Sequence, residues 1–157
     1  MCPPLLTRWK TRQMTMDKGI KEILKKYRDA AKKGDPEAQC VMGEIYDDGE
    51  IVKQDQEKAV FWFRKSAEQG YAEAQYRLGL MYNCGWGVSE DWKEAFKWYR
   101  LAAEQGIAKA QFIIGCRYAD GEGTAKDKVE AEKWLRKSAE QGHTKARQKL
   151  KRLEMEE

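Results

Sequence analysis

The side chains that could carry out chemistry are few, and their spacing matches no catalytic or metal-binding arrangement. His143 is the single histidine, so a nucleophile–histidine pair has only one candidate base. It follows Gly142 near the start of a predicted helix, where we expect an exposed residue of the helix cap. The cysteines lack the recurring spacing of zinc sites and disulfide frameworks, and we expect reduced, partly buried thiols. They are Cys2, Cys40, Cys84 and Cys116.

Two other patterns are compatible with ligand chemistry but are better explained as local structure. The segments Gly85–Trp86–Gly87 and 121–123 lack the Gly-Lys-Ser/Thr of a phosphate-binding loop and follow no predicted strand, so we expect turns. The paired acids Asp47–Asp48 and Glu90–Asp91 fall where helix ends and caps are expected. We therefore predict no catalytic residue, no metal site and no cofactor.

Charge is unevenly distributed along the 157 residues, whose net charge is +4. Residues 1–33 hold 10 basic and 3 acidic residues, a balance of +7, whereas residues 34–141 hold 15 and 20, a balance of −5. This distribution argues against a nucleic-acid-binding face, which needs a basic stripe on the folded surface. The sequence contains no apolar run of bilayer length and no signal-peptide pattern, so we expect a cytoplasmic protein.

A period of 36 residues runs through the sequence and predicts a helical repeat array. The repeated positions hold Gly34, Gly70, Gly106 and Gly142; Trp62, Trp98 and Trp134; Tyr46, Tyr82 and Tyr118. Each repeat is predicted as helix, loop and helix, because apolar residues recur at helical spacing. The first helices are expected at 36–48, 72–84 and 108–120, and the second at 55–69, 91–105 and 127–141.

These positions divide the chain into three repeats with a half-repeat at either end. The predicted units are a flexible basic tail at 1–16, an N-terminal capping helix at 17–33, repeats at 34–69, 70–105 and 106–141, and a C-terminal capping helix at 142–157. Helices that cap an array carry polar residues in core columns. Lys26 stands in the tryptophan column of the first capping helix, as this interpretation requires.

The repeated tryptophans, tyrosines and glycines are predicted to form the core. Trp62, Trp98 and Trp134 lie among small residues at helical spacing, which favours burial over a base-stacking platform. Glycine in a helix interior costs about 1 kcal/mol relative to alanine. Its recurrence in the first helices therefore predicts that another helix backbone crosses closely at these points. The positions are Gly43, Gly79 and Gly115.

The middle repeat resembles the Sel-1-like repeat, a relative of the tetratricopeptide repeat with a longer loop between its helices. The residues that carry the resemblance are Ala74, Leu78–Gly79, Tyr82, Gly85–Trp86–Gly87–Val88, Asp91, Lys93, Ala95, Trp98 and 102–106. The resemblance implies an all-α, α/α right-handed superhelical solenoid whose concave wall is lined by the first helices. It also implies a non-enzymatic scaffold or adaptor. A cysteine-rich branch of the family binds or hydrolyses β-lactams, but its paired cysteines are absent here.

Tetratricopeptide relatives bind partners with the first-helix residues that lie opposite the core face, and the resemblance carries this role to a concave groove. The predicted groove residues are Glu44, Asp47, Asp48, Glu73, Tyr76, Leu80, Asn83, Lys109, Phe112 and Cys116. We expect an apolar middle and an acidic N-terminal end, suited to a protein or peptide with apolar anchors and a basic segment. Alternatively, Tyr76 and Phe112 only pack within their own repeats.

Two other functions stay open at this point. One is binding or hydrolysis of a small molecule or cell-wall fragment, as in the cysteine-rich branch. The other is an electrostatic contact of the basic residues 1–33 with nucleic acid or an anionic membrane. Neither has a motif in the sequence, so a protein-interaction scaffold is the favoured prediction.

Overall fold

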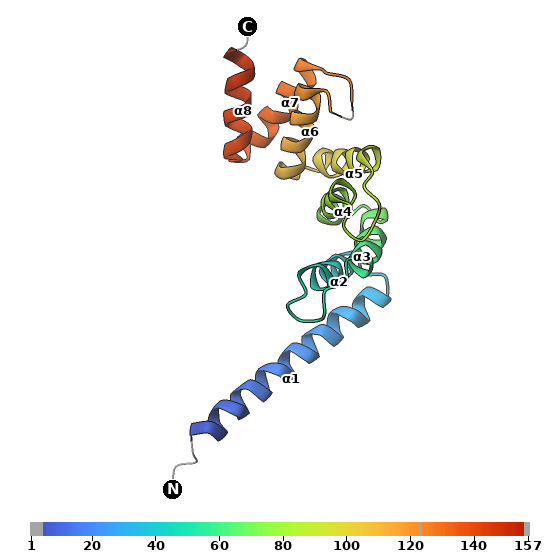
Figure 1. Ribbon diagram of the computed structural model, residues 1–157, viewed down its shortest axis with the longest axis vertical. Helices are drawn as coiled ribbons and strands as arrows, with labels where there is room; N and C mark the ends of the chain where they lie inside the picture. The colour runs from blue at the N-terminus through green and yellow to red at the C-terminus, as the bar shows by residue number, and fades with distance from the viewer. Residues whose placement is uncertain (1–4, 123, 156–157) are drawn as a thin grey trace.

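The chain folds as a curved array of antiparallel helix pairs. The computed structural model describes residues 5–122 and 124–155, and the side chains from Lys18 onward. This part of the chain forms eight helices and no strand: α1 (Leu5–Lys32), α2 (Pro36–Asp48), α3 (Gln56–Glu68), α4 (Ala72–Cys84), α5 (Trp92–Glu104), α6 (Ala108–Asp120), α7 (Lys128–Glu140) and α8 (Thr144–Met155). The helices follow an arc with α1 and α8 at its two ends (Figure 1). No helix among the described residues is long and apolar enough to cross a bilayer.

The six predicted repeat helices are confirmed to within one residue at each end, and for the second helices the sequence marks both ends chemically. The second helices α3, α5 and α7 begin after Asp55, Asp91 and Asp127, whose carboxylates accept N–H bonds of the first turn. After each second helix comes a glycine with positive φ, for example Gly70 at 87° and Gly106 at 96°. Positive φ is the conformation that glycine adopts most readily where a helix ends.

The prediction of a tail at residues 1–16 is wrong for residues 5–16, which are helical. Helix α1 begins at Leu5 instead of Asp17 and projects from the end of the arc (Figure 1). The segment from Leu5 to Lys18 contains neither proline nor glycine, and its Leu, Met, Arg, Lys and Gln residues favour helix.

At Gly43 and Gly79 the nearest neighbours are side-chain atoms of the same repeat, which corrects the prediction of a crossing backbone there. At Gly115 the backbone N of Leu135 also lies 3.1 Å from a built Cβ, so a helix backbone does approach closely at that position. A Cβ at Gly43 would lie 2.6 Å from the Phe63 ring, and one at Gly79 would lie 2.7 Å from the Tyr99 ring. In the third repeat, Leu135 takes this role against Gly115. These side chains follow the tryptophan column by one residue and are at most 2% exposed. The tight helix pairing therefore depends on a large side chain opposite a glycine.

Trp98 and Trp134 are buried, but Trp62 is only half-buried, so the tryptophan column is not uniformly core. A complete repeat precedes Trp98 and Trp134, whereas only α1 precedes the repeat that contains Trp62. The tyrosine column varies as well: Tyr82 is 8% exposed, and Tyr46 and Tyr118 are half-buried. Burial in these columns thus depends on the position of the repeat in the array.

A buried glutamine network joins each repeat to the one before it. Gln75 on α4 is 4% exposed, and its Nε2 donates to the Ala67 carbonyl at 3.2 Å. Its Oε1 accepts a 2.8 Å bond from Gln105 Nε2, which also donates to the Gly70 carbonyl at 2.9 Å. Gln111 and Gln141 repeat the arrangement one unit later. Because these amides bond across three helices, they fix how successive repeats are placed.

Replacing Gln75 by leucine is expected to destabilise the protein by about 1–2 kcal/mol, since hydrogen bonds of a buried amide are lost and Gln105 is left short of an acceptor. Urea unfolding measures the change. Gln148→Leu on the exposed surface of α8 is the matched control and should leave the unfolding midpoint unchanged. Equal midpoints for the two variants would show that the network does not contribute.

Candidate partner-binding surface

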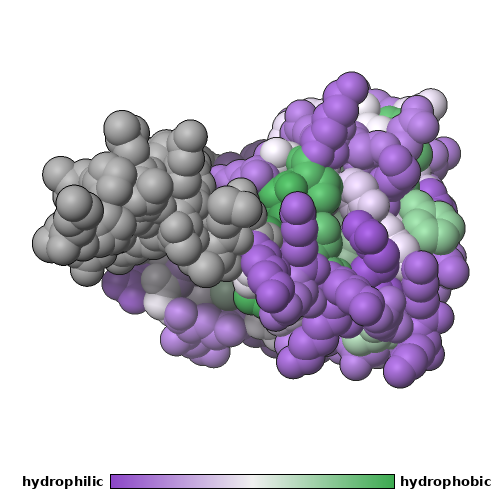
Figure 2. All heavy atoms as spheres, turned by 90° about the horizontal axis from the view of Figure 1, so that it is seen from below, coloured by the Kyte–Doolittle hydropathy of each residue, from purple (hydrophilic) through white to green (hydrophobic). Residues whose placement is uncertain are grey.

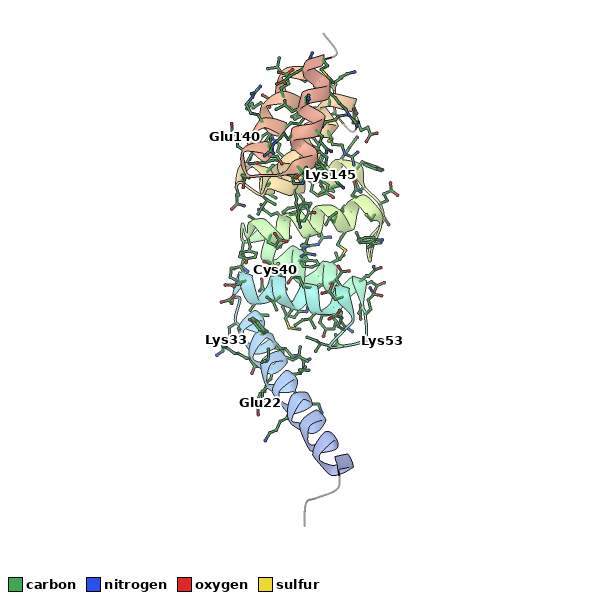
Figure 3. The ribbon with its side chains drawn as sticks, turned by 90° about the vertical axis from the view of Figure 1, so that its left-hand side faces the viewer. Glu22, Lys33, Cys40, Lys53, Glu140 and Lys145 are labelled. Atoms are coloured by element: carbon green, nitrogen blue, oxygen red, sulfur yellow. The ribbon has the colours of Figure 1, made fainter. Side chains whose placement is uncertain are left out.

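The predicted groove residues lie on α2, α4 and α6, along the inner side of the arc. Helices α2 and α4 cross this side in succession (Figures 1 and 3). Cys40 is labelled on α2 in Figure 3 and is 3% exposed. Burial raises the pKa of its thiol to about 12, and Glu44 and Glu73 add to the rise, so the thiol stays protonated. Cys40 and the half-buried Cys116 are reduced in the structure, and Cys84 is exposed.

The acidic end of this surface contains a cation that the sequence argument did not include. Arg77 Nη2 lies 3.0 Å from Glu44 Oε1, and Arg77 Nε lies 3.0 Å from Glu73 Oε1. The guanidinium therefore links α2 to α4 and neutralises part of the cluster. Asp47 is half-buried and Asp48 is exposed, and both lie beside this pair at the end of α2. The acidic surface left for a partner is centred on these two aspartates.

Burial and mutual repulsion hold two of these carboxyl groups above their ordinary pKa. The pKa of Glu44 is raised mainly by burial, with contributions from Glu73, Asp48 and Asp47, and Arg77 opposes the rise. The pKa of Asp47 is raised by burial and by Asp48. A carboxylate that is poorly solvated and surrounded by like charges gains from a neighbouring cation. The cluster therefore favours a basic group on a bound segment.

The apolar middle of the surface is partly used in packing within the fold. The Tyr76 ring lies 6.0 Å from that of Tyr99 on α5, and burial raises the pKa of Tyr76. The Phe112 ring stacks on the imidazole of His143 at 4.7 Å. Tyr76 and Phe112 are nevertheless only half-buried, as are Leu80 and Cys116, so part of each side chain is in contact with solvent. One side of each of these four side chains therefore packs within the fold, and the other side faces solvent.

His143 differs from the sequence expectation, because it is half-buried instead of exposed. Its Nδ1 accepts a 3.2 Å bond from the backbone N–H of Ala146 in the first turn of α8. The cap position was predicted, whereas its ring contact with Phe112 was not. The imidazole therefore serves to start α8 and to support Phe112.

At the far end of α4, Asn83 is bound to a second arginine that sequence reasoning missed. Arg117 Nη2 donates to Asn83 Oδ1 at 2.7 Å, and Arg117 Nη1 lies 3.3 Å from Glu122 Oε2. The guanidinium also lies 4.1 Å from the centre of the Trp92 ring. Lys109, in contrast, is exposed at the start of α6. Asn83 is thus occupied by an internal contact, while Lys109 faces solvent.

The spacing of Glu73 and Arg77 could have indicated their ion pair, because residues four apart lie on one helix face. The contacts of Arg117 with Asn83 and Trp92 gave no comparable signal, since these two partners are distant from it in the sequence. Polar pairs also join successive first helices: Glu44 to Arg77, Asn83 to Arg117 and Asp120 to Lys149. The inner side of the arc is therefore crossed by polar links between neighbouring repeats.

Comparison with known proteins identifies the repeats. The Sel1 repeat family model matches residues 36–71, 72–107 and 108–143. A Sel1 repeat protein from Oxalobacter formigenes is 39% identical, with a TM-score of 0.76 over 82% of this chain and 96% of that one. A protective antigen present in uropathogenic Escherichia coli strains, with an SLR fold, is 42% identical, with a TM-score of 0.72. That match covers 76% of this chain and 26% of the antigen.

Helicobacter pylori cysteine rich protein B is 22% identical, with a TM-score of 0.61 over 83% of this chain and 93% of its own. At this level of identity the likeness shows the fold alone. No curated protein sequence matches the chain. The three matched repeats, together with the two structures of higher identity, show that the chain belongs to the Sel1 repeat family.

Proposed function

We propose that the inner side of the arc binds a segment of a partner protein and that the chain acts as a non-enzymatic scaffold. Sel1 repeats are generally protein-interaction modules, which supports this class of function. The observation that carries the proposal is a set of half-buried apolar side chains on α4 and α6, together with an acidic cluster at the end of α2. Tyr76, Leu80 and Phe112 form the set, and Asp47 and Asp48 mark the acidic end.

This arrangement suits an extended or helical segment with apolar anchors and a basic end. Half-buried aromatic rings bind partners well, because they are already held in place and lose little conformational freedom. Tyr99 holds Tyr76, and His143 holds Phe112, so both rings are held in this way. The pKa of Asp47 is raised by burial and by the neighbouring charge of Asp48, and a lysine or arginine of the partner would offset both effects.

The double variant Tyr76→Ala, Phe112→Ala is expected to weaken binding of selected peptides by about tenfold or more, as loss of hot-spot aromatics does. A peptide phage library selected on the immobilised protein provides the probe, and titration calorimetry measures the affinity. We expect selected sequences to combine bulky apolar residues with Lys or Arg. Circular dichroism checks that the variant keeps its helices.

The matched control replaces two exposed apolar residues on second helices, Phe61→Ala and Leu101→Ala, and should retain the affinity. Replacing Asp47 and Asp48 by Asn should reduce both the affinity and its dependence on salt. If the Tyr76 and Phe112 variant binds the selected peptides as tightly as the unaltered protein does, the inner side is not the binding surface.

A further inference from the structure

Helix α1 corresponds to the second helix of a repeat, and no helix among the described residues covers it as a first helix covers α3, α5 and α7. Shifted by one period, Ile23 corresponds to Ala59, Ala95 and Ala131. Those alanines are at most 1% exposed, whereas Ile23 is 57% exposed. In every full repeat, therefore, the first helix covers the position that α1 leaves in solvent. An isoleucine at this position has more apolar surface to bury than the alanines do.

Neighbouring positions of α1 are uncovered in the same way. Tyr27 corresponds to Phe63, and Ala30 corresponds to Ser66; both residues of the repeat are fully buried. Tyr27 and Ala30 are only half-buried. Together with Ile20, which is 40% exposed, they extend the uncovered face along α1.

Helix α2 has a matching uncovered edge. Ile45 corresponds to Met81, which is 2% exposed, and to Arg117, which contacts the first helix before it. Ile45 is only half-buried and lines a cavity of about 140 Å³ with Val41 and Ile51. Three acidic residues border this cavity: Glu44, Asp48 and Glu50. Figure 2, seen from the α1 end, shows apolar surface beside the grey atoms and hydrophilic side chains around it.

Gly19 adds an independent observation. The mid-helix glycines of the repeats each face a side chain of the adjacent helix, such as Phe63 opposite Gly43. Gly19 lies in the middle of α1, and a Cβ built there would meet nothing within 4 Å. Glycine in a helix interior costs about 1 kcal/mol, and no contact within the described residues offsets it. A second helix that crosses α1 at Gly19 would provide the missing neighbour.

We propose that α1 of a second copy of this chain covers the uncovered face, so that the protein is a two-fold symmetric dimer. The first and second helices of a repeat are antiparallel, as the bonds from Asp55 N to Tyr46 O and from Ser138 Oγ to Ala108 O show. An antiparallel pair of α1 helices centred on Gly19 has this direction and the symmetry that most dimers have. Each α1 then takes, against the other copy's α1, the place that a first helix takes in the full repeats.

The acidic border of the cavity on α2 suits a basic helix as its neighbour. Helix α1 holds 9 basic and 3 acidic residues, and the basic ones include Lys18, Lys21 and Lys25. In the dimer, α1 of one copy lies along the acidic border of the other copy's cavity, formed by Glu44, Asp48 and Glu50. An anionic membrane would meet the same carboxylates and be repelled by them. A flat bilayer surface also fits the edge between α1 and α2 less well than a helix does.

The experiment measures the mass of the full chain in solution by light scattering and sedimentation over a range of protein concentrations. The unaltered protein should have about twice the chain mass of 18.3 kDa. The variant Ile20→Glu, Ile23→Glu should raise the dimer dissociation constant more than ~10-fold, because charged groups replace buried apolar contacts. Both residues are exposed in one copy, so the variant should keep its helicity.

The matched control is Val129→Glu on α7, where a 76% exposed residue lies far from α1, and it should stay dimeric. A protein that is monomeric at every concentration overturns the proposal, as does a dimer unaffected by the Ile20 and Ile23 changes. A monomer that binds phosphatidylserine vesicles through these residues would assign α1 to a membrane instead. None of these outcomes depends on peptide binding at Tyr76 and Phe112.

Discussion

Replacing Phe63 by alanine should destabilise the protein by about 3–5 kcal/mol, the range found when a buried aromatic residue is truncated. Phe63 has no exposed surface, and its ring lies directly against Gly43. Alanine would leave a cavity between α2 and α3 that glycine cannot fill. A typical domain is stable by about 5–15 kcal/mol, so this single change would remove a large share. Urea unfolding followed by circular dichroism measures it.

The neighbouring variant Trp62→Ala provides the contrast. Trp62 is larger than Phe63 but is partly exposed, so its truncation leaves no closed cavity and should cost less than that of Phe63. The sequence period alone would rank the tryptophan as the more important residue. A larger loss of stability for Trp62→Ala than for Phe63→Ala would contradict the packing described for the first repeat.

The second large effect is expected for Gly87→Ala in the loop between α4 and α5. Gly87 has a φ of 65°, where a side chain costs about 1–2 kcal/mol. A Cβ there would also overlap the backbone of Gln56 and lie 2.7 Å from the Glu57 N. Because backbone at the start of α3 cannot move as a side chain can, overpacking adds about 1–3 kcal/mol.

Gly85→Ala is the matched control, since its φ of 67° is similar but its Cβ would meet nothing closer than 3.5 Å. It should lose only the conformational contribution, about 1–2 kcal/mol. Differential scanning calorimetry of both variants separates the two effects. If the Gly85→Ala and Gly87→Ala variants have the same melting temperature, the contact between this loop and α3 does not contribute to stability.

The helix pattern could be predicted from the sequence because its signals are local and are repeated. Asp91 at the start of α5 and Gly106 after its end are chemical markers that act within one turn of the helix. The period then copies each assignment to the other repeats. The Sel1 family assignment follows from the same columns.

Other features could not be predicted because they depend on neighbours distant in the sequence. Nothing near Phe63 indicates that it, and not Trp62, faces Gly43, since the choice depends on the rotation of α3 against α2. Arg117 reaches Asn83, 34 residues earlier, and that contact appears only when two repeats are placed together. The start of α1 at Leu5 could not be predicted, because residues 5–16 favour helix by composition but lack the apolar periodicity that identifies the other helices.

For the candidate site, the sequence indicated which positions lie on the inner side but not how each is used. Tyr76 and Phe112 are half-exposed, as partner-binding residues need to be, yet each also supports or is supported by another ring. Glu44 was expected to be available to a partner, and Arg77 holds it instead. Burial and pairing of this kind depend on side-chain geometry, which a column of residue types does not contain.

Each helix packs chiefly against the helices next to it in the sequence, and this pattern determines which parts of the molecule unfold first. None of the main helix–helix contacts within the described residues joins one end of the array to the other, so each end can open while the centre stays closed. Amide protons of α4 and α5 should therefore exchange with deuterium most slowly, and those of α8 and the start of α1 most rapidly. Contacts between residues that are close in the sequence also favour fast folding, because no long loop must be closed before the first repeat can form.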